Sequence, residues 1–131
     1  MKYLLDTNIC IYYFKGQFGL NDKFDKIGFD NFAISEITLA ELYFGAENSQ
    51  FIQKNTEIIN EFASKIKVIP ILGSIRIYAK EKARLKANGN MISDFDLLIG
   101  STAISSNLIL ISRNIKEFIR LEDLNFENWI D

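Results

Sequence analysis

Short apolar runs alternate along this chain with longer segments in which apolar residues recur at the spacing of a helix face. The short runs predict buried strands, and the longer segments predict helices packed on them. Strands are expected at residues 2–5, 32–34, 68–70 and 108–111, with an edge strand at 125–129. Helices are expected at residues 7–14, 20–27, 35–44, 52–66, 75–87, 94–106 and 115–119. Strands separated by helices favour a largely parallel sheet covered on both faces, so the pattern predicts an α/β fold.

Polar residues and a glycine at the segment ends support these boundaries. Ser35 and Ser93 stand where a side-chain oxygen can cap the first turn of a helix. Thr7 or Asn8 suits the same role after the first strand. Gly45 is expected to stop the helix that begins at Ser35, because glycine favours helix ends.

Length and composition predict one domain over residues 1–131. The chain has 131 residues, 48% of them apolar, which suits one hydrophobic core and is short for two. No apolar run approaches the roughly 20 residues that span a bilayer, and Asp6 interrupts the N-terminal run, unlike a signal peptide. The single cysteine, Cys10, permits no internal disulfide and fits a reducing compartment. We therefore expect a cytoplasmic protein with no membrane segment.

The charge balance hides a basic stretch. The chain carries 15 basic and 17 acidic residues, which argues weakly against a nucleic-acid partner. Residues 65–86, however, contain seven basic residues and Glu81 as the only acid. Such a stretch can bind phosphates even on a mildly acidic protein, although it can also be an ordinary solvated helix face. The candidate RNA-binding residues are Lys80, Lys82, Arg84 and Lys86.

Three acids occupy unusually apolar surroundings. Asp6 ends the first strand, at the sheet edge where α/β folds bind ligands, although it could also simply cap the next helix. Glu41 has Ile37, Thr38, Phe44 and Gly45 as its one-turn neighbours on a helix. Asp96 shares a buried stripe with Ile99, Gly100 and Ala103, although Ser93-x-x-Asp96 also resembles a capping box.

Two further polar segments lie near the expected positions of these acids. Ser112, Arg113 and Asn114 follow the strand at 108–111, which places them at the same sheet edge as Asp6. Asn114 could orient a water molecule or a carboxylate there. Asp94 suits the first turn of its helix, where the helix dipole favours an acid.

Carboxylates brought close together repel one another unless some are protonated or a cation neutralises them. A set of Asp, Glu and Asn oxygens favours hard ions such as Mg²⁺ or Mn²⁺ over zinc. The chain contains no histidine, which excludes a histidine base and histidine-ligated zinc. The pattern therefore indicates metal-assisted chemistry, such as phosphodiester cleavage.

Four short motifs stand along the chain: Leu5-Asp6-Thr7-Asn8, Thr38–Leu42, Asp94–Ile99 and Ser112-Arg113-Asn114. They follow the order seen in PIN-domain ribonucleases, and the chain resembles most closely the VapC toxins of type II toxin–antitoxin systems. The resemblance covers essentially the whole chain, including residues 124–129, which look like the closing strand of that family. It implies a single PIN domain with a three-layer α/β/α fold and a central, mostly parallel sheet of four to five strands.

The resemblance also implies roles for individual residues. Asp6 and Asp96 would be the principal metal ligands and Glu41 the third acid of the pocket. Asn114 would complete the catalytic set, at a position where many members carry an acid. This asparagine would lower the charge of the pocket by one and weaken a second metal site. Secondary pocket positions would be Asp94, Ser112 and Asn8.

As a whole, the resemblance implies an Mg²⁺-dependent endoribonuclease, with Mn²⁺ able to substitute, that cuts tRNA or rRNA to inhibit translation. It implies a homodimer and a cognate VapB-type antitoxin whose tail occupies the groove.

Two alternatives remain open at this point. The first is a PIN-fold module that binds RNA or a partner without catalysis, and Asn114 is the feature in its favour. The second is a phosphatase or receiver-like domain with Asp6 as nucleophile. A phosphatase of the haloacid-dehalogenase type would carry aspartate where Asn8 stands, and a receiver would carry a lysine near residues 112–114. The sequence therefore disfavours the second.

Overall fold

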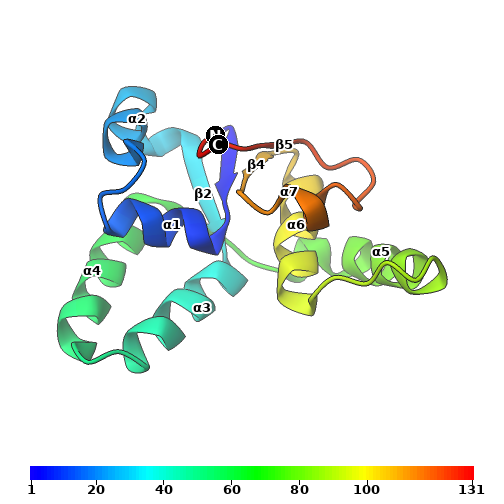
Figure 1. The fold of residues 1–131 in the computed structure, drawn as a ribbon, viewed down its shortest axis with the longest axis horizontal. Coiled ribbons are helices and arrows are strands. Elements are labelled where there is room, and N and C mark those ends of the chain that lie inside the picture. The colour runs from blue at the N-terminus through cyan, green and yellow to red at the C-terminus, as the bar shows by residue number, and fades with distance from the viewer.

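A parallel sheet of five short strands runs through the computed structural model, which describes residues 1–131 (Figure 1). The strands are ordered β3-β2-β1-β4-β5, and every neighbouring pair is parallel. In the central register, Leu4 pairs with Ala33 on one side and with Leu110 on the other. The strands are β1 (Tyr3–Leu5), β2 (Phe32–Ser35), β3 (Lys67–Ile69), β4 (Ile109–Ile111) and β5 (Phe126–Glu127).

Helices cover both faces of this sheet (Figure 1). One layer contains α1 (Thr7–Phe14), α2 (Leu20–Ile27), α3 (Glu36–Glu47) and α4 (Ile52–Lys65). The opposite layer contains α5 (Ile75–Ala87), α6 (Asp94–Ser106) and α7 (Ile115–Phe118). Two 3₁₀ turns that the sequence pattern did not predict lie at Phe29–Asn31 and Leu72–Ser74. The predicted three-layer α/β/α fold is confirmed.

Successive residues of a strand pack into two separate hydrophobic cores, one on each face of the sheet. Leu5, Ile34 and Ile111 are fully buried under α1–α4. Leu4 and Leu110 are fully buried under α5–α7. This division follows from the pleat of a strand, in which successive side chains point to opposite faces. Because both faces are covered, the strands read as continuous apolar runs.

Two helix boundaries differ from the prediction. The helix α3 does not stop at Gly45 but continues to Glu47, with Asn48 as its C-cap. Its last turn holds Ala46 against the core, with 3% of its surface exposed, and this packing outweighs the weak helix propensity of glycine. At the start of α1 the cap is Asp6 rather than Thr7 or Asn8.

None of the helices is both long and apolar enough to cross a lipid bilayer.

Candidate functional site

Asp6 lies at the carboxyl end of β1, in the middle of the sheet. The chain leaves β1 toward β2 on one side, whereas β4 pairs with β1 on the other side. The strand order therefore reverses at this point, which is where open α/β sheets form a ligand crevice. Ser112 follows β4 at the same edge, as the sequence predicted.

Two hydrogen bonds hold the buried carboxylate of Asp6. Its Oδ1 accepts the backbone N–H of Thr7 at 2.8 Å, and its Oδ2 accepts the hydroxyl of Ser112 at 2.7 Å. The Ser112 hydroxyl oxygen in turn accepts the backbone N–H of Asn114 at 3.0 Å. Burial raises the pKa of Asp6 and the nearby Glu41 raises it further, against the lowering effect of the two hydrogen bonds. The carboxylate is thus oriented but left short of positive charge.

Glu41 reaches the same site from α3. The Thr7 hydroxyl donates to Glu41 Oε1 at 2.6 Å, and it lies 3.1 Å from the hydroxyl of Thr38, one turn before Glu41. Thr7 therefore connects two acids, through its backbone to Asp6 and through its side chain to Glu41. Sequence reasoning treated Thr7 only as a possible helix cap.

Asp96 approaches from the opposite helical layer, in the first turn of α6. Ser93 is the N-cap of this helix and accepts the backbone N–H of Asp96 at 3.2 Å, as predicted. Burial is the largest cause that raises the pKa of Asp96 to about 6, followed by the charge of Asp6 and the carboxyl of Glu117. A half-buried aspartate with neighbouring acids is a hallmark of functional sites.

Glu117 is the acid that sequence reasoning missed. It lies on the short helix α7, and its carboxyl lies close enough to Asp96 to help raise the pKa of that residue. Glu117 adds a fourth carboxyl beside Asp96, and the effect of Asn114 on the charge of the pocket stays a prediction. The available signal was the acid three residues after Asn114, on a helix that begins at the same sheet edge.

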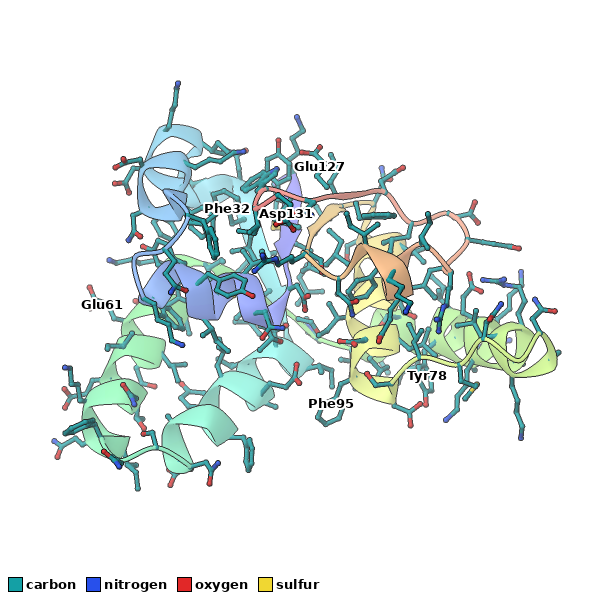
Figure 2. All side chains as sticks on the ribbon, viewed as in Figure 1. Phe32, Glu61, Tyr78, Phe95, Glu127 and Asp131 are labelled. Carbon is teal, nitrogen blue, oxygen red and sulfur yellow. The ribbon has the colours of Figure 1, made fainter.

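Three other candidate residues lie at the margins of this group. Asn114 precedes α7 as its N-cap residue, and no side-chain cap bond is formed there. Asn8 is exposed on the first turn of α1. Asp94 accepts hydrogen bonds from two residues of α5, Lys82 Nζ at 2.9 Å and Tyr78 Oη at 2.8 Å. Figure 2 labels Tyr78 beside that helix.

Of the four predicted RNA contacts on α5, two are paired with other residues of the fold and two make no ion pair. Arg84 is bound within the fold, donating to Glu81 Oε2 at 2.6 Å and to the carbonyl of Arg120 at 2.7 Å. Lys82 pairs with Asp94. Lys80 and Lys86 are exposed and make no ion pair. Arg84 therefore has a structural role within the fold, and its predicted contact with RNA stays a prediction.

An apolar pocket of about 440 Å³ borders Glu41 between α1, α3 and α4. Its walls include Ile11, Phe14, Leu42 and Ile58, and Lys15 and Lys54 lie at its edge. We call it the α1–α3–α4 pocket.

The four acids suit a hard divalent cation by their chemistry. Asp6, Glu41, Asp96 and Glu117 offer only oxygen donors, the set that Mg²⁺ and Mn²⁺ prefer. The pKa values of Asp6 and Asp96 are raised in part by neighbouring acids, and a bound cation would relieve that repulsion. No three acidic or cysteine side chains of the chain are placed to hold one metal ion together, so binding would require these side chains to move.

Comparison with known proteins gives consistent matches along the chain. The PIN domain family model matches residues 3–124. Ribonuclease VapC2 of Haemophilus influenzae is 36% identical over 132 residues, which cover 99% of each protein. The tRNA(fMet)-specific endonuclease VapC of Shigella flexneri is 34% identical over 131 residues, which cover 98% of each. The solved VapBC2 of Rickettsia felis, bound to a DNA fragment from its promoter, aligns with a TM-score of 0.90 and 35% identity. That alignment covers 98% of this chain and 99% of the other.

Proposed function

We propose that this chain, which belongs to the VapC group of the PIN-domain family, is an endoribonuclease toxin that inhibits translation by cutting RNA. The observation that carries the proposal is the meeting of acids from both helical layers at the crevice beside β1. Thr7 hydrogen-bonds to both Asp6 and Glu41. Burial, together with the charges of Asp6 and Glu117, raises the pKa of Asp96. Relatives of similar length that carry the name ribonuclease or tRNA endonuclease support the same activity.

The proposed cofactor is Mg²⁺, with Mn²⁺ able to replace it, held by Asp6, Asp96 and Glu41 with Glu117 beside them. Bound there, the ion would orient the phosphodiester, activate a water molecule and neutralise the leaving oxygen. Ser112 and Thr7 fix the direction of the Asp6 carboxylate before any ligand arrives. Burial and the charges of Asp6 and Glu117 raise the pKa of Asp96, and a bound cation would offset the repulsion between these acids.

The partners follow from the same family membership. We propose a cognate VapB-type antitoxin, because solved relatives are VapBC complexes. Its tail would enter the α1–α3–α4 pocket, where apolar walls and two lysines border Glu41. We further propose a single PIN domain over residues 1–131, a homodimer as the basic unit and action on tRNA or rRNA in the cytoplasm. Relatives named ribonuclease and tRNA endonuclease favour the enzyme over the alternative of a catalytically inactive module, and Glu117 adds an acid beside Asp96.

The purified protein is expected to cut RNA in the presence of Mg²⁺ or Mn²⁺ and to stop when EDTA removes the ion. Sequencing the RNA ends that form after brief induction in cells would identify the substrate, and denaturing gels of that RNA would measure the cleavage rate. Failure of both ions to support cleavage of any cellular RNA would contradict the proposal.

The lysines of α5 that have no ion-pair partner are expected to attract the RNA backbone. Replacing Lys80 and Lys86 together by glutamine should weaken RNA binding and lower the salt dependence of the affinity, since each phosphate contact releases counterions. Measuring the dissociation constant over a range of salt concentrations tests this slope. Replacing Lys67, an exposed lysine on the edge strand β3, provides the control. An unchanged slope in the double variant would place the substrate elsewhere.

A further inference from the structure

Beside the acidic site, two aromatic rings and a guanidinium form a cluster that the proposed cleavage chemistry does not use. The rings of Tyr12 and Phe18 meet edge to face, with centroids 5.0 Å apart and planes at 80°. The guanidinium carbon of Arg113 lies 5.4 Å from the Phe18 ring centre and 5.9 Å from that of Tyr12. We call these three residues the stacking platform.

The platform is joined directly to the catalytic edge of the sheet. Arg113 follows Ser112, whose hydroxyl donates to Asp6. Tyr12 lies on α1, the helix that Asp6 caps, six residues further along. Six residues of an α-helix rise by about 9 Å, so the platform lies about this far along α1 from Asp6.

Phe18 has an unfavourable backbone conformation that its packing in the fold does not explain. Its φ is +58°, in the left-handed region that bulky side chains rarely occupy. Gly16 and Gly19 take similar angles in the same loop, where glycine meets no steric penalty. Despite this strain Phe18 is only about half buried, since 49% of its surface stays exposed. A strained and exposed aromatic residue beside a reaction centre points to a ligand.

The orientation of Arg113 is also fixed. Its Nε and one terminal nitrogen donate to the two carboxylate oxygens of Asp131, each at 3.2 Å, and the other terminal nitrogen lies 3.4 Å from Tyr12 Oη. The side chain is nevertheless 44% exposed. Exposed aromatic rings beside an arginine stack unpaired nucleobases, whereas a paired base in a helix offers no free face.

We propose that Tyr12, Phe18 and Arg113 form a subsite that stacks one unpaired RNA base next to the phosphodiester that is cut. This inference rests on the proposed ribonuclease function and deepens it, because it assigns the contact with one base to three named residues beside the acids. The half-exposed Phe18 ring supplies the stacking face, and Arg113 adds a positive charge beside it.

The test compares Phe18→Asn with Phe51→Asn. Asparagine tolerates the left-handed conformation, so Phe18→Asn removes the ring and relieves strain together. Phe51 is 64% exposed and is the N-cap of α4, where asparagine is a favoured residue, so the same substitution there is a matched control. Both changes are made in wild type for cleavage and in an Asp96→Asn background for binding without cleavage.

Binding is measured with a short single-stranded RNA that carries 2-aminopurine, and with the same RNA in a duplex. Loss of one stacked base is expected to weaken single-stranded binding about tenfold in Phe18→Asn. Quenching of 2-aminopurine should disappear, duplex binding should stay the same, and the melting temperature should not fall. Phe51→Asn should match the parent in every measurement.

Three outcomes would overturn the inference. One is equal single-stranded binding and quenching in Phe18→Asn and its parent. Another is a fall in melting temperature with RNA binding intact, which would make Phe18 a packing residue. The third is an effect confined to the antitoxin complex, which would make the platform a protein contact. Failure of wild type to cut or bind any RNA would instead refute the proposed function itself.

Discussion

Replacing Asp96 by asparagine is expected to lower the rate of RNA cleavage by at least about 100-fold, the scale on which losing one electrostatic group lowers kcat. The same change is expected to stabilise the metal-free protein at neutral pH. Both effects would have one cause, because the charged form of Asp96, the proposed metal ligand, is disfavoured by burial, by Asp6 and by Glu117.

The pH dependence separates this cause from ordinary loss of packing. The fold raises the pKa of Asp96 from its usual 3.8 to about 6, so the folded protein binds more protons than the unfolded chain between those values. The contribution of Asp96 to stability is therefore present at low pH and is lost as the pH rises through about 6. Melting temperatures of Asp96→Asn and wild type in EDTA should differ more at pH 8 than at pH 5.

Asp94→Asn provides a matched control from the same helical turn. Asp94 is exposed and paired with Lys82, so its replacement should leave cleavage close to wild type and should not reproduce the gain in stability at high pH. Equal loss of cleavage in both variants, or an Asp96→Asn protein that cuts RNA at the normal rate, would contradict the assignment of Asp96.

Replacing Glu81 by alanine is expected to lower the free energy of unfolding by about 2–3 kcal/mol. Its buried carboxylate accepts hydrogen bonds from Arg84 Nε at 2.6 Å and from the backbone N–H of Glu122 at 3.1 Å. The loss should fall below the 3–5 kcal/mol typical of a broken buried pair, since Arg84 is 28% exposed and keeps contact with water. Urea unfolding should show a lower midpoint with an unchanged slope.

The control for this prediction is Glu61→Ala. Glu61 pairs with Lys65 one turn away at 3.1 Å, and both side chains are largely exposed, so the expected loss is below about 0.5 kcal/mol. If Glu81→Ala is no more destabilising than Glu61→Ala, the contacts between α5 and the C-terminal segment contribute little to stability.

The sequence predicted what depends on local pattern. The strand and helix periods, the caps at Ser35 and Ser93 and the apolar surroundings of Glu41 and Asp96 can all be read within one or two helical turns. Parallel pairing then brings Asp6 and Ser112 to one edge, because the carboxyl ends of neighbouring parallel strands coincide.

What the sequence did not predict depends on contacts between distant segments. Arg84 resembles any other cation of a basic helix until its bond to the carbonyl of Arg120, 36 positions away, is seen. Lys82 likewise finds Asp94 across the packing of α5 on α6. Glu117 was missed because its short helix has no clear apolar period and is placed by tertiary packing alone. Contacts between side chains of different helices are therefore harder to predict from the sequence than the fold is.

The four acids lie where the two separate hydrophobic cores meet, so a bound ion would affect how the two layers move. Glu41 belongs to the layer of α1–α4, whereas Asp96 and Glu117 belong to the layer of α6 and α7, and Asp6 sits on the sheet between them. An ion bound by acids from both layers would connect them. Its binding would therefore reduce the motion of the two separately packed layers relative to each other.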